Sequence, residues 1–138
     1  MLDVRNGASD NEGWTTIGEN LVSTEMTDDP ATHVWQVFDL PELMKLVAGG
    51  EPRIREFLRT PGMSLSIYHL PVGAIDMQAP HYEDEIYVVL SGTATVRIDD
   101  EEREVERGSV LFVKATTSHS FFDITEDLTV LAIFGGSV

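Results

Sequence analysis

The stretch from Gly73 to Gly92 reads GAIDMQAPHYEDEIYVVLSG, and it carries the strongest structural and functional signal in the chain. Two glycines bound a segment that ends in an apolar, β-rich run, which is typical of a strand between turns. Alternate side chains of a strand point to opposite faces, so His81 and Glu85 are predicted to share one face. With His119 from further along the chain, they form a ligand set that a divalent transition metal accepts.

The composition limits the kind of protein that this chain can be. Its 138 residues, 42% of them hydrophobic, predict one domain with a substantial core. There is no cysteine, which excludes disulfides and thiolate metal sites, so a metal must bind to His, Asp, Glu, Gln, Tyr or backbone ligands. No apolar run approaches the roughly 18–20 residues of a membrane helix, and residues 1–10 lack an apolar signal core. We therefore expect a cytoplasmic protein.

The charge of the chain is strongly acidic, with 24 Asp and Glu against 9 Lys and Arg and a net charge of −15. A field of this sign repels phosphate backbones and anionic lipid headgroups, so neither nucleic acid nor a membrane surface is an expected partner. The only lysines are Lys45 and Lys114. Proteins adapted to high salt share this balance with ordinary acidic proteins, and the sequence leaves the choice open.

The N-terminal part differs in composition from the rest. Residues 1–32 are rich in acidic and small polar residues, which predicts a partly flexible arm with at most one short strand around 20–26. Residues 33–38 (HVWQVF) alternate and are β-rich, so they are predicted to form a strand that opens a single folded domain, 33–138.

A short helix is predicted after this strand. Asp39 suits the N-cap and Pro41 the first turn of a helix over 41–48, which the pair Gly49–Gly50 ends. Residues 51–60 fit either a second short helix or the beginning of a strand.

From Met63 onward the hydrophobic pattern has a period of two, which indicates β-structure. Short strands with frequent turn signals, and no helix between them to make a parallel crossover, predict an all-β sandwich or barrel. No internal repeat is visible, so we expect one β unit. The predicted strands are 63–70, 78–90, 93–98, 103–107, 109–114, 119–123 and 127–134.

The stretch that ends at Gly92 resembles the first conserved motif of the cupins. That motif is Gly, five residues, His-x-His, three or four residues, Glu, six residues and Gly. The spacing here is the same, with Gly73, His81, Glu85 and Gly92 in the matching positions. The first histidine of the motif is replaced by Ala79.

The second cupin motif, roughly Gly-x5-Pro-x-Gly-x2-His-x3-Asn, is matched more loosely. Gly108 and His119 agree with it, whereas Lys114, Thr116 and Asp123 stand in the Pro, Gly and Asn positions. The chain is thus similar to small single-domain cupins of the type-2 kind, with the core motifs within 65–134.

The cupin resemblance implies both a fold and a cofactor. The implied fold is all-β, a double-stranded β-helix or jelly-roll barrel of six to eight strands with a short helical N-terminal extension. The implied cofactor is one divalent transition metal (Fe, Mn, Zn or Ni), held in the barrel mouth by His81, Glu85 and His119. Without a histidine at position 79, two His and one carboxylate remain, like the facial triad of non-haem iron enzymes. The same departure also fits a site that has lost its metal.

Further candidates for a ligand or pocket role are Gln78, Tyr87 and His69. Gln78 is out of phase with His81 and would need a bulge at Pro80 to face the mouth. Core packing is an equal alternative for Tyr87 and the favoured one for His69.

Three classes of function fit these residues, and no catalytic residue is predicted. One class is a metal-free β scaffold that works mainly by dimerising. The other two involve a small molecule. One is a metal-dependent enzyme on a small organic substrate, of the oxygenase type with iron or of the isomerase or hydrolase type with zinc or manganese. The other is a non-catalytic module that binds a small molecule such as a sugar or effector, with or without metal. Cupins commonly dimerise through sheet edges, so we also expect a homodimer.

Overall fold

The structure, a computed structural model, describes residues 34–76 and 80–135. The chain divides into two compact units, Met1–Phe38 and Asp39–Val138. Of the first unit, residues 34–38 are described, and they form no strand, so the strand predicted over 33–38 is wrong for these residues. Their apolar side chains at 34, 35 and 37 are exposed. Alternation of apolar and polar residues forms a strand only where a neighbouring strand and a core complete it, and residues 34–38 pair with no strand in the part of the chain that the structure describes.

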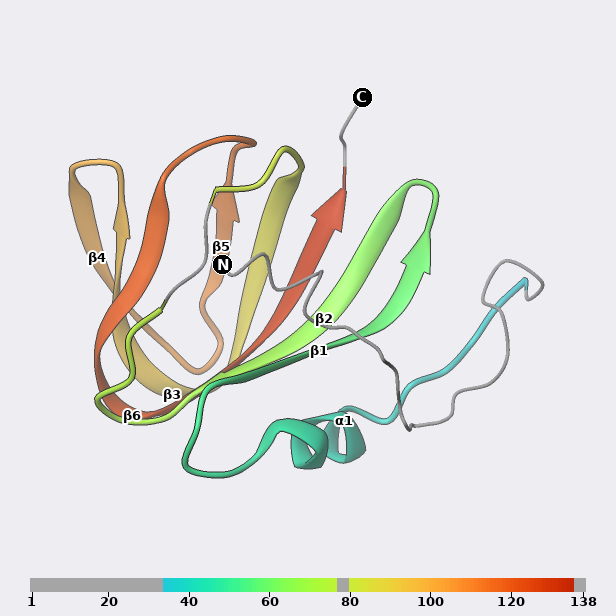
Figure 1. Cartoon of the computed structure of the whole chain (residues 1–138), viewed down its shortest axis with the longest axis horizontal. Helices are drawn as coiled ribbons and strands as arrows, with labels where there is room; N and C mark the ends of the chain where they lie inside the picture. Colours follow the sequence, from blue (N-terminus) through green and yellow to red (C-terminus); the bar gives the residue numbers. More distant parts are fainter. Residues whose placement is uncertain (1–33, 77–79, 136–138) are drawn as a thin grey trace. The chain divides into compact units, whose positions relative to one another are not determined.

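Helix α1, Leu40–Val47, opens the second unit within one residue of the predicted helix. Pro41 lies in the first turn, where a missing N–H costs no helical hydrogen bond. The helix packs on the first two strands and buries Leu43 and Val47 (Figure 1). Gly49, with φ +135°, follows its end as predicted.

Six strands follow the helix and confirm the predicted all-β fold with a short helical extension. Residues 51–60, which the sequence left open, contain the first strand. The strands are β1 Arg53–Thr60, β2 Met63–Leu70, β3 Asp84–Ile98, β4 Glu101–Glu106, β5 Val110–Val113 and β6 His119–Gly135.

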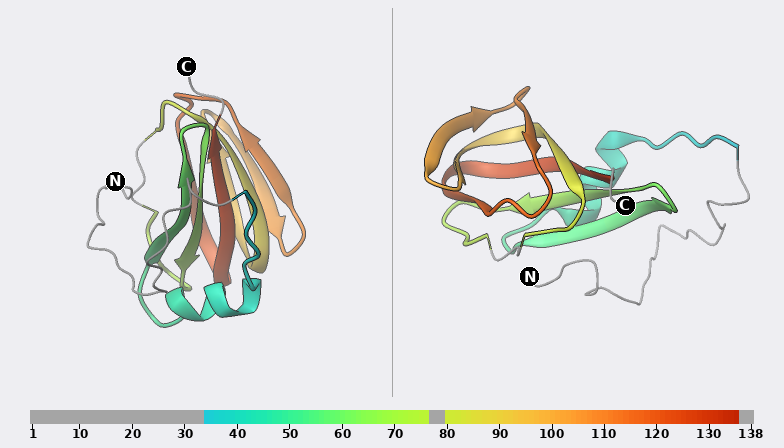
Figure 2. Two further views of the ribbon diagram at one scale, coloured as in Figure 1. Left: turned by 90° about the vertical axis from the view of Figure 1, so that its right-hand side faces the viewer. Right: turned by 90° about the horizontal axis from the view of Figure 1, so that it is seen from above.

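All strand pairs are antiparallel, and the sheet order is β1-β2-β6-β3-β4. β5 pairs with the beginning of β3. The long strands β3 and β6 pair along nearly their whole lengths and curl, so that the second unit forms a barrel (Figure 2). The core of this barrel is a single cluster of buried side chains from β2 to β6.

Two predicted strand breaks, at 91–92 and at 124–126, are wrong, because β3 and β6 are continuous there. Residues 91 and 92 were expected to separate two strands, yet β3 runs through them with shifts of register between Val89 and Thr95. Gly92 has φ +95°, a conformation open mainly to glycine, which bends the strand instead of ending it. β3 also begins at Asp84, later than the predicted start at 78.

Candidate functional site

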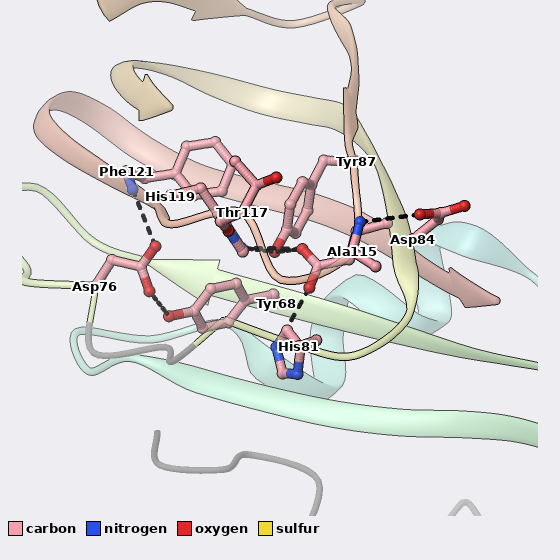
Figure 3. A network of polar contacts seen from close by, with 10 residues as sticks. Tyr68, Asp76, His81, Asp84, Tyr87, Ala115, Thr117, His119 and Phe121 are labelled. Atoms are coloured by element: carbon pink, nitrogen blue, oxygen red, sulfur yellow. Dashed lines mark hydrogen bonds and ion pairs between the residues drawn. The ribbon is translucent and has the colours of Figure 1, made fainter. Parts of the chain in front are cut away.

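Glu85 lies at the centre of the predicted metal site. Glu85 is 1% exposed, and its side chain points from β3 into the barrel. Oε1 lies 2.9 Å from Nε2 of His119, and Oε2 lies 3.5 Å from Nε2 of His81 (Figure 3). The three residues that the sequence singled out therefore form one buried cluster, which we call the Glu85 cluster.

His81 reaches this cluster from a loop rather than from a strand. It precedes the start of β3, so the strand alternation that predicted a shared face with Glu85 does not apply to it. Two bonds hold the loop instead: the N–H of Thr116 donates to the His81 carbonyl (2.7 Å), and the N–H of Ala115 donates to Asp84 Oδ1 (2.9 Å). Contacts with the segment after β5 therefore position His81.

His119, the first residue of β6, has a defined ring orientation. Its Nδ1 lies 2.8 Å from the carbonyl oxygen of Thr117, which can only accept, so Nδ1 carries a proton and Nε2 faces Glu85. A neutral ring would then place its Nε2 lone pair against a carboxylate. The contact therefore requires a cation between the two groups, either a proton, carried by Nε2 or by the carboxyl group, or a metal ion.

The local electrostatics favour that cation. Burial acts to lower the pKa of His119, but the hydrogen bond and the negative charge of Glu85 oppose it, with smaller contributions from the Thr117 carbonyl and the Asp76 carboxylate. The net effect raises the pKa of the ring above its ordinary value. The cluster thus attracts positive charge.

Tyr87 joins the cluster through its hydroxyl. The ring is fully buried on the same side of β3 as Glu85, and its O–H donates to Glu85 Oε1 (2.8 Å). The same oxygen lies 3.1 Å from Nε2 of His119. Tyr87 is thus a core residue, as one of the two alternatives from the sequence had it, and its hydroxyl contacts the Glu85 cluster.

The donor types of the cluster suit a divalent transition metal. Among the described residues, no group of three or more His, Asp or Glu side chains already has the arrangement of a metal site. Two imidazole nitrogens and a carboxylate are nevertheless ligands that such metals accept. The bond from Nδ1 of His119 to a backbone carbonyl is the outer contact that commonly orients a metal-binding histidine. The residues therefore fit a metal in the place of the proton.

A second buried carboxylate, Asp76, holds the strand that carries His119. Its Oδ1 accepts from the hydroxyl of Tyr68 (2.8 Å), and its Oδ2 accepts from the backbone N–H of Phe121 (2.9 Å) (Figure 3). Phe121 is two residues beyond His119, so Asp76 fixes the start of β6. The partners of Asp76 are visible only in the fold, because they come from distant parts of the chain.

Of the remaining two candidates, only His69 belongs to the described residues, and it lies outside the cluster. His69 is bound at both nitrogens, with Nδ1 3.0 Å from the Thr129 hydroxyl and Nε2 2.8 Å from the Gly49 carbonyl. It ties the segment after α1 to β2 and β6 and takes no part in the Glu85 cluster. Gln78 lies outside the described residues.

Two buried serines on β2 are an interior feature that the sequence analysis missed. Ser64 and Ser66 are at most 1% exposed, and their hydroxyls have no hydrogen-bond partner among the described residues. Ser66 lies opposite Ala132, and the neighbour of Ala132 on its other side is Tyr87. A buried unpaired hydroxyl costs about 1–3 kcal/mol, so the two serines are poor core residues and good contacts for a bound molecule. The Ser-x-Ser spacing within an apolar strand was the available signal.

The cluster is more closed than the open barrel mouth that we expected. The side chains of Glu85 and His119 are 1% exposed and that of His81 is 6% exposed. Two cavities of about 400 and 460 Å³ lie outside the cluster. The first is lined by residues 72–76 and 120–124 and the second mainly by residues of β3 and β4.

The metal-free protein is expected to lose stability as the pH rises through the pKa of His119. This pKa is raised in the folded state, so the protonated ring stabilises the fold fully below its unfolded pKa of about 6.5 and loses that effect above the folded value. Urea unfolding of chelator-treated protein across this pH range, beside His119→Gln, measures the contribution. Identical pH profiles for the two proteins would contradict it.

Comparison with known proteins gives a consistent result. Residues 66–134 match the profile of the family described as "Cupin domain". An uncharacterized protein of Streptomyces coelicolor is 41% identical over 99 residues, which cover 72% of this chain and 94% of that protein.

Solved structures share the fold at low sequence identity. A cupin superfamily protein from Desulfitobacterium hafniense matches with a TM-score of 0.59 and 20% identity over 72% of this chain and 92% of that one. The DMSP lyase DddQ from Ruegeria pomeroyi matches with a TM-score of 0.59 and 16% identity over 64% of this chain. This chain spans 48% of the length of that lyase. In the part of the chain that the structure describes, no helix has the length and apolar character needed to cross a membrane.

Proposed function

Because the chain belongs to the cupin family, we propose that it is a metal-dependent cupin in which His81, Glu85 and His119 bind one divalent transition metal ion and a small organic molecule binds inside the barrel. The observation that carries this proposal is the position of Glu85. Its two carboxylate oxygens face one imidazole nitrogen each in a buried site, and one of these contacts needs a cation. A proton fills this role when no metal is present.

Each residue of the cluster has a distinct part in this function. A bound metal would supply Lewis acidity or, with iron, dioxygen chemistry. The Thr117 carbonyl fixes the ring of His119, and the buried walls exclude water. Tyr87 holds a proton at Oη within hydrogen-bond distance of Glu85 and His119, which makes it the nearest proton source for a bound molecule.

The unpaired hydroxyls of Ser64 and Ser66 support binding of a small molecule with oxygen or nitrogen groups. Both serines lie on the inner side of β2. Ser66, Ala132 and Tyr87 are neighbours in one row across three strands, so only the methyl group of Ala132 lies between Ser66 and Tyr87. The likeness to a protein named as a DMSP lyase extends to the fold alone, and it makes DMSP one reasonable compound to test. The metal, once identified, selects among oxygenase, isomerase and hydrolase assays.

A non-catalytic binding module is the second candidate, and two observations favour it. Ala79 replaces a family ligand, and the Glu85 cluster is nearly closed to solvent. Such a module would bind its ligand without turnover, so the two functions differ in whether the bound compound is converted.

Metal content tests the proposal directly. We expect about one metal ion per chain in wild-type protein purified without a His tag or added metal. We expect the ion to be lost in both His81→Ala and His119→Ala. His69→Gln is the matched control, because it removes a buried histidine that lies outside the cluster and should lower the melting temperature while keeping the metal. Elemental analysis measures all four proteins, and metal retained in both cluster variants would refute the assignment.

Binding of a small molecule is tested separately. The metal-loaded protein is screened by thermal shift against small organic acids, sugars and DMSP, and hits are followed by product analysis. The Ser64→Ala/Ser66→Ala variant is expected to keep its metal, to be at least as stable as wild type without ligand, and to bind a hit more weakly. If the variant were less stable and bound the hit unchanged, the serines would have a structural role instead.

A further inference from the structure

A band of four polar side chains lies on β1 and β2, on the same face of the sheet as Glu85. In the pairing register, Ser64 of β2 lies opposite Arg59 of β1, and Ser66 lies opposite Glu56. Cross-strand partners present their side chains on the same face of a sheet, so all four share the inner face of the serines. On the other side of β2, the row of Ser64 continues across β6 to Glu85. We call the four side chains on β1 and β2 the polar band.

Arg59 and Glu56 form the exposed end of the polar band. The guanidinium of Arg59 donates to both carboxylate oxygens of Glu56, from Nη2 at 2.7 Å and from Nε at 2.9 Å. The side chain of Arg59 is 53% exposed and that of Glu56 is 30% exposed. An ion pair in contact with water contributes little to stability, so the guanidinium can turn to another carboxylate at small cost. A basic group therefore lies beside the buried serines in a strongly acidic chain.

The two serines of the polar band are spaced for one carboxylate. Both are at most 1% exposed, and their hydroxyls have no hydrogen-bond partner among the described residues. Side chains two residues apart on a strand are separated by about 6.7 Å. A carboxylate has oxygens about 2.2 Å apart that each accept a hydroxyl at about 2.6 Å, so it spans about 7 Å when the bonds are slightly bent. One carboxylate can therefore accept from both hydroxyls at once.

We infer that the molecule bound inside the barrel is a small carboxylic acid. Its carboxylate accepts hydrogen bonds from Ser64 and Ser66, and Arg59 turns from Glu56 to complete the site. This inference rests on the proposed small-molecule site and adds the chemical class of its ligand. A buried carboxylate needs hydrogen-bond donors and a positive charge, and the polar band supplies both. A sugar would satisfy the two hydroxyls as well, but it would gain nothing from the charge of Arg59.

The width of the sheet limits the length of this acid. Strands β2 and β3 are separated by β6, so they lie two strand spacings apart, about 9.6 Å. The serines and Glu85 both extend their side chains into this space. A molecule that contacts both ends therefore has a chain of roughly three to five heavy atoms beyond its carboxylate. An oxygen at the far end suits the Glu85 cluster, because divalent metals accept oxygen ligands.

Calorimetric titration of metal-loaded protein tests the chemical class. The ligands are the ω-hydroxy acids from 3-hydroxypropanoate to 5-hydroxypentanoate, their amides, and the amines with the same chains. We expect the best acid to bind at least about tenfold more tightly than its amide, because an ionised acceptor forms stronger hydrogen bonds than a neutral one. Amides or amines that bind as tightly as the acids would overturn the inference and leave the proposed function intact.

Replacement of Arg59 tests where the carboxylate lies. Arg59→Gln should weaken binding of the acid by at least about tenfold and leave binding of the amide within about twofold. Arg97→Gln is the matched control, because it breaks a similarly exposed ion pair with Glu102 outside the polar band and should bind the acid like wild type. Far-UV circular dichroism and metal analysis check that each variant folds and keeps its metal.

Glu56→Gln gives a result that a merely structural ion pair would not give. It removes the carboxylate that competes for Arg59, so the acid should bind about two- to fivefold more tightly. Weaker binding in this variant would count against the inference.

Two further outcomes separate this inference from the proposed function. An acid preference that is unchanged in Arg59→Gln and in Ser64→Ala/Ser66→Ala would place the carboxylate at the metal instead, which overturns the inference alone. If none of the acids, amides or amines bound to metal-loaded protein, the inference would fail together with the small-molecule part of the proposed function.

Discussion

Replacement of Gly92 by alanine is expected to destabilise the protein by roughly 3–5 kcal/mol, because the added methyl group meets both an unfavourable backbone conformation and the backbone of β6. Gly92 has φ +95°, which an L-residue rarely adopts. A Cβ at this position would lie 2.1 Å from the carbonyl oxygen of Asp127, so the backbone of β6 must move. Urea unfolding followed by circular dichroism measures the loss, and Gly92→Ala can fail to fold altogether at this magnitude.

Gly108→Ala is the matched control for this prediction. Gly108 has nearly the same φ, +94°, but a Cβ there would meet no atom within 4 Å. Gly108→Ala is therefore expected to lower the stability of the fold only through the unfavourable backbone conformation, by about 1–2 kcal/mol. If the two variants lost the same stability, the close approach of β3 to β6 at Gly92 would not matter to the fold.

Glu85→Gln is expected to weaken metal binding by at least about 100-fold while the metal-free protein still folds. Loss of an outer partner of a metal ligand typically costs 10–100-fold in affinity, and loss of a charged ligand should cost more. Glutamine keeps the shape of the side chain but not the negative charge that faces His81 and His119. Calorimetric titration with Zn²⁺ or Mn²⁺ measures the affinity directly.

The melting temperature provides a second test of metal binding by Glu85→Gln. A metal at 100 times its dissociation constant stabilises the folded state by about 2.7 kcal/mol, so wild-type protein should melt higher with metal and Glu85→Gln should not. His69→Gln is the control, since it alters a buried polar residue outside the cluster and should keep a metal-dependent shift. An unchanged shift in Glu85→Gln would remove Glu85 from the ligand set.

The sequence predicted the elements whose signal is local. The alternation over 63–70 gave β2 with both ends correct, and Pro41 and Gly49 placed α1 within one residue. Both signals depend on the conformations of a few neighbouring residues, so the secondary structure that they predict does not depend on distant contacts. The spacing of the cupin motifs likewise selected the residues of the Glu85 cluster before their contacts were known.

The incorrect predictions concern local sequence patterns that are compatible with two different structures. A glycine with φ > 0 can end a strand at a hairpin turn, or it can bend a strand that continues. Gly92 bends β3, because β6 pairs with β3 on both sides of it. The alternating residues 34–38 have the pattern of a strand but pair with none of the described strands. In both cases the outcome depends on a partner that lies elsewhere in the chain.

The sequence by itself thus determined the β-rich period, the helix, the acidic charge and the residue types of the candidate site. Tertiary structure alone brought that site together. Glu85 and His119 stand near opposite ends of the β3–β6 ladder, 13 residues apart along β3, or about 43 Å if the strand were straight. Curling of the sheet closes that distance to a 2.9 Å contact. The same curling places Tyr87, Ser64 and Ser66 on the inside of one barrel, because the alternation of side chains tells which residues share a face but not which faces meet.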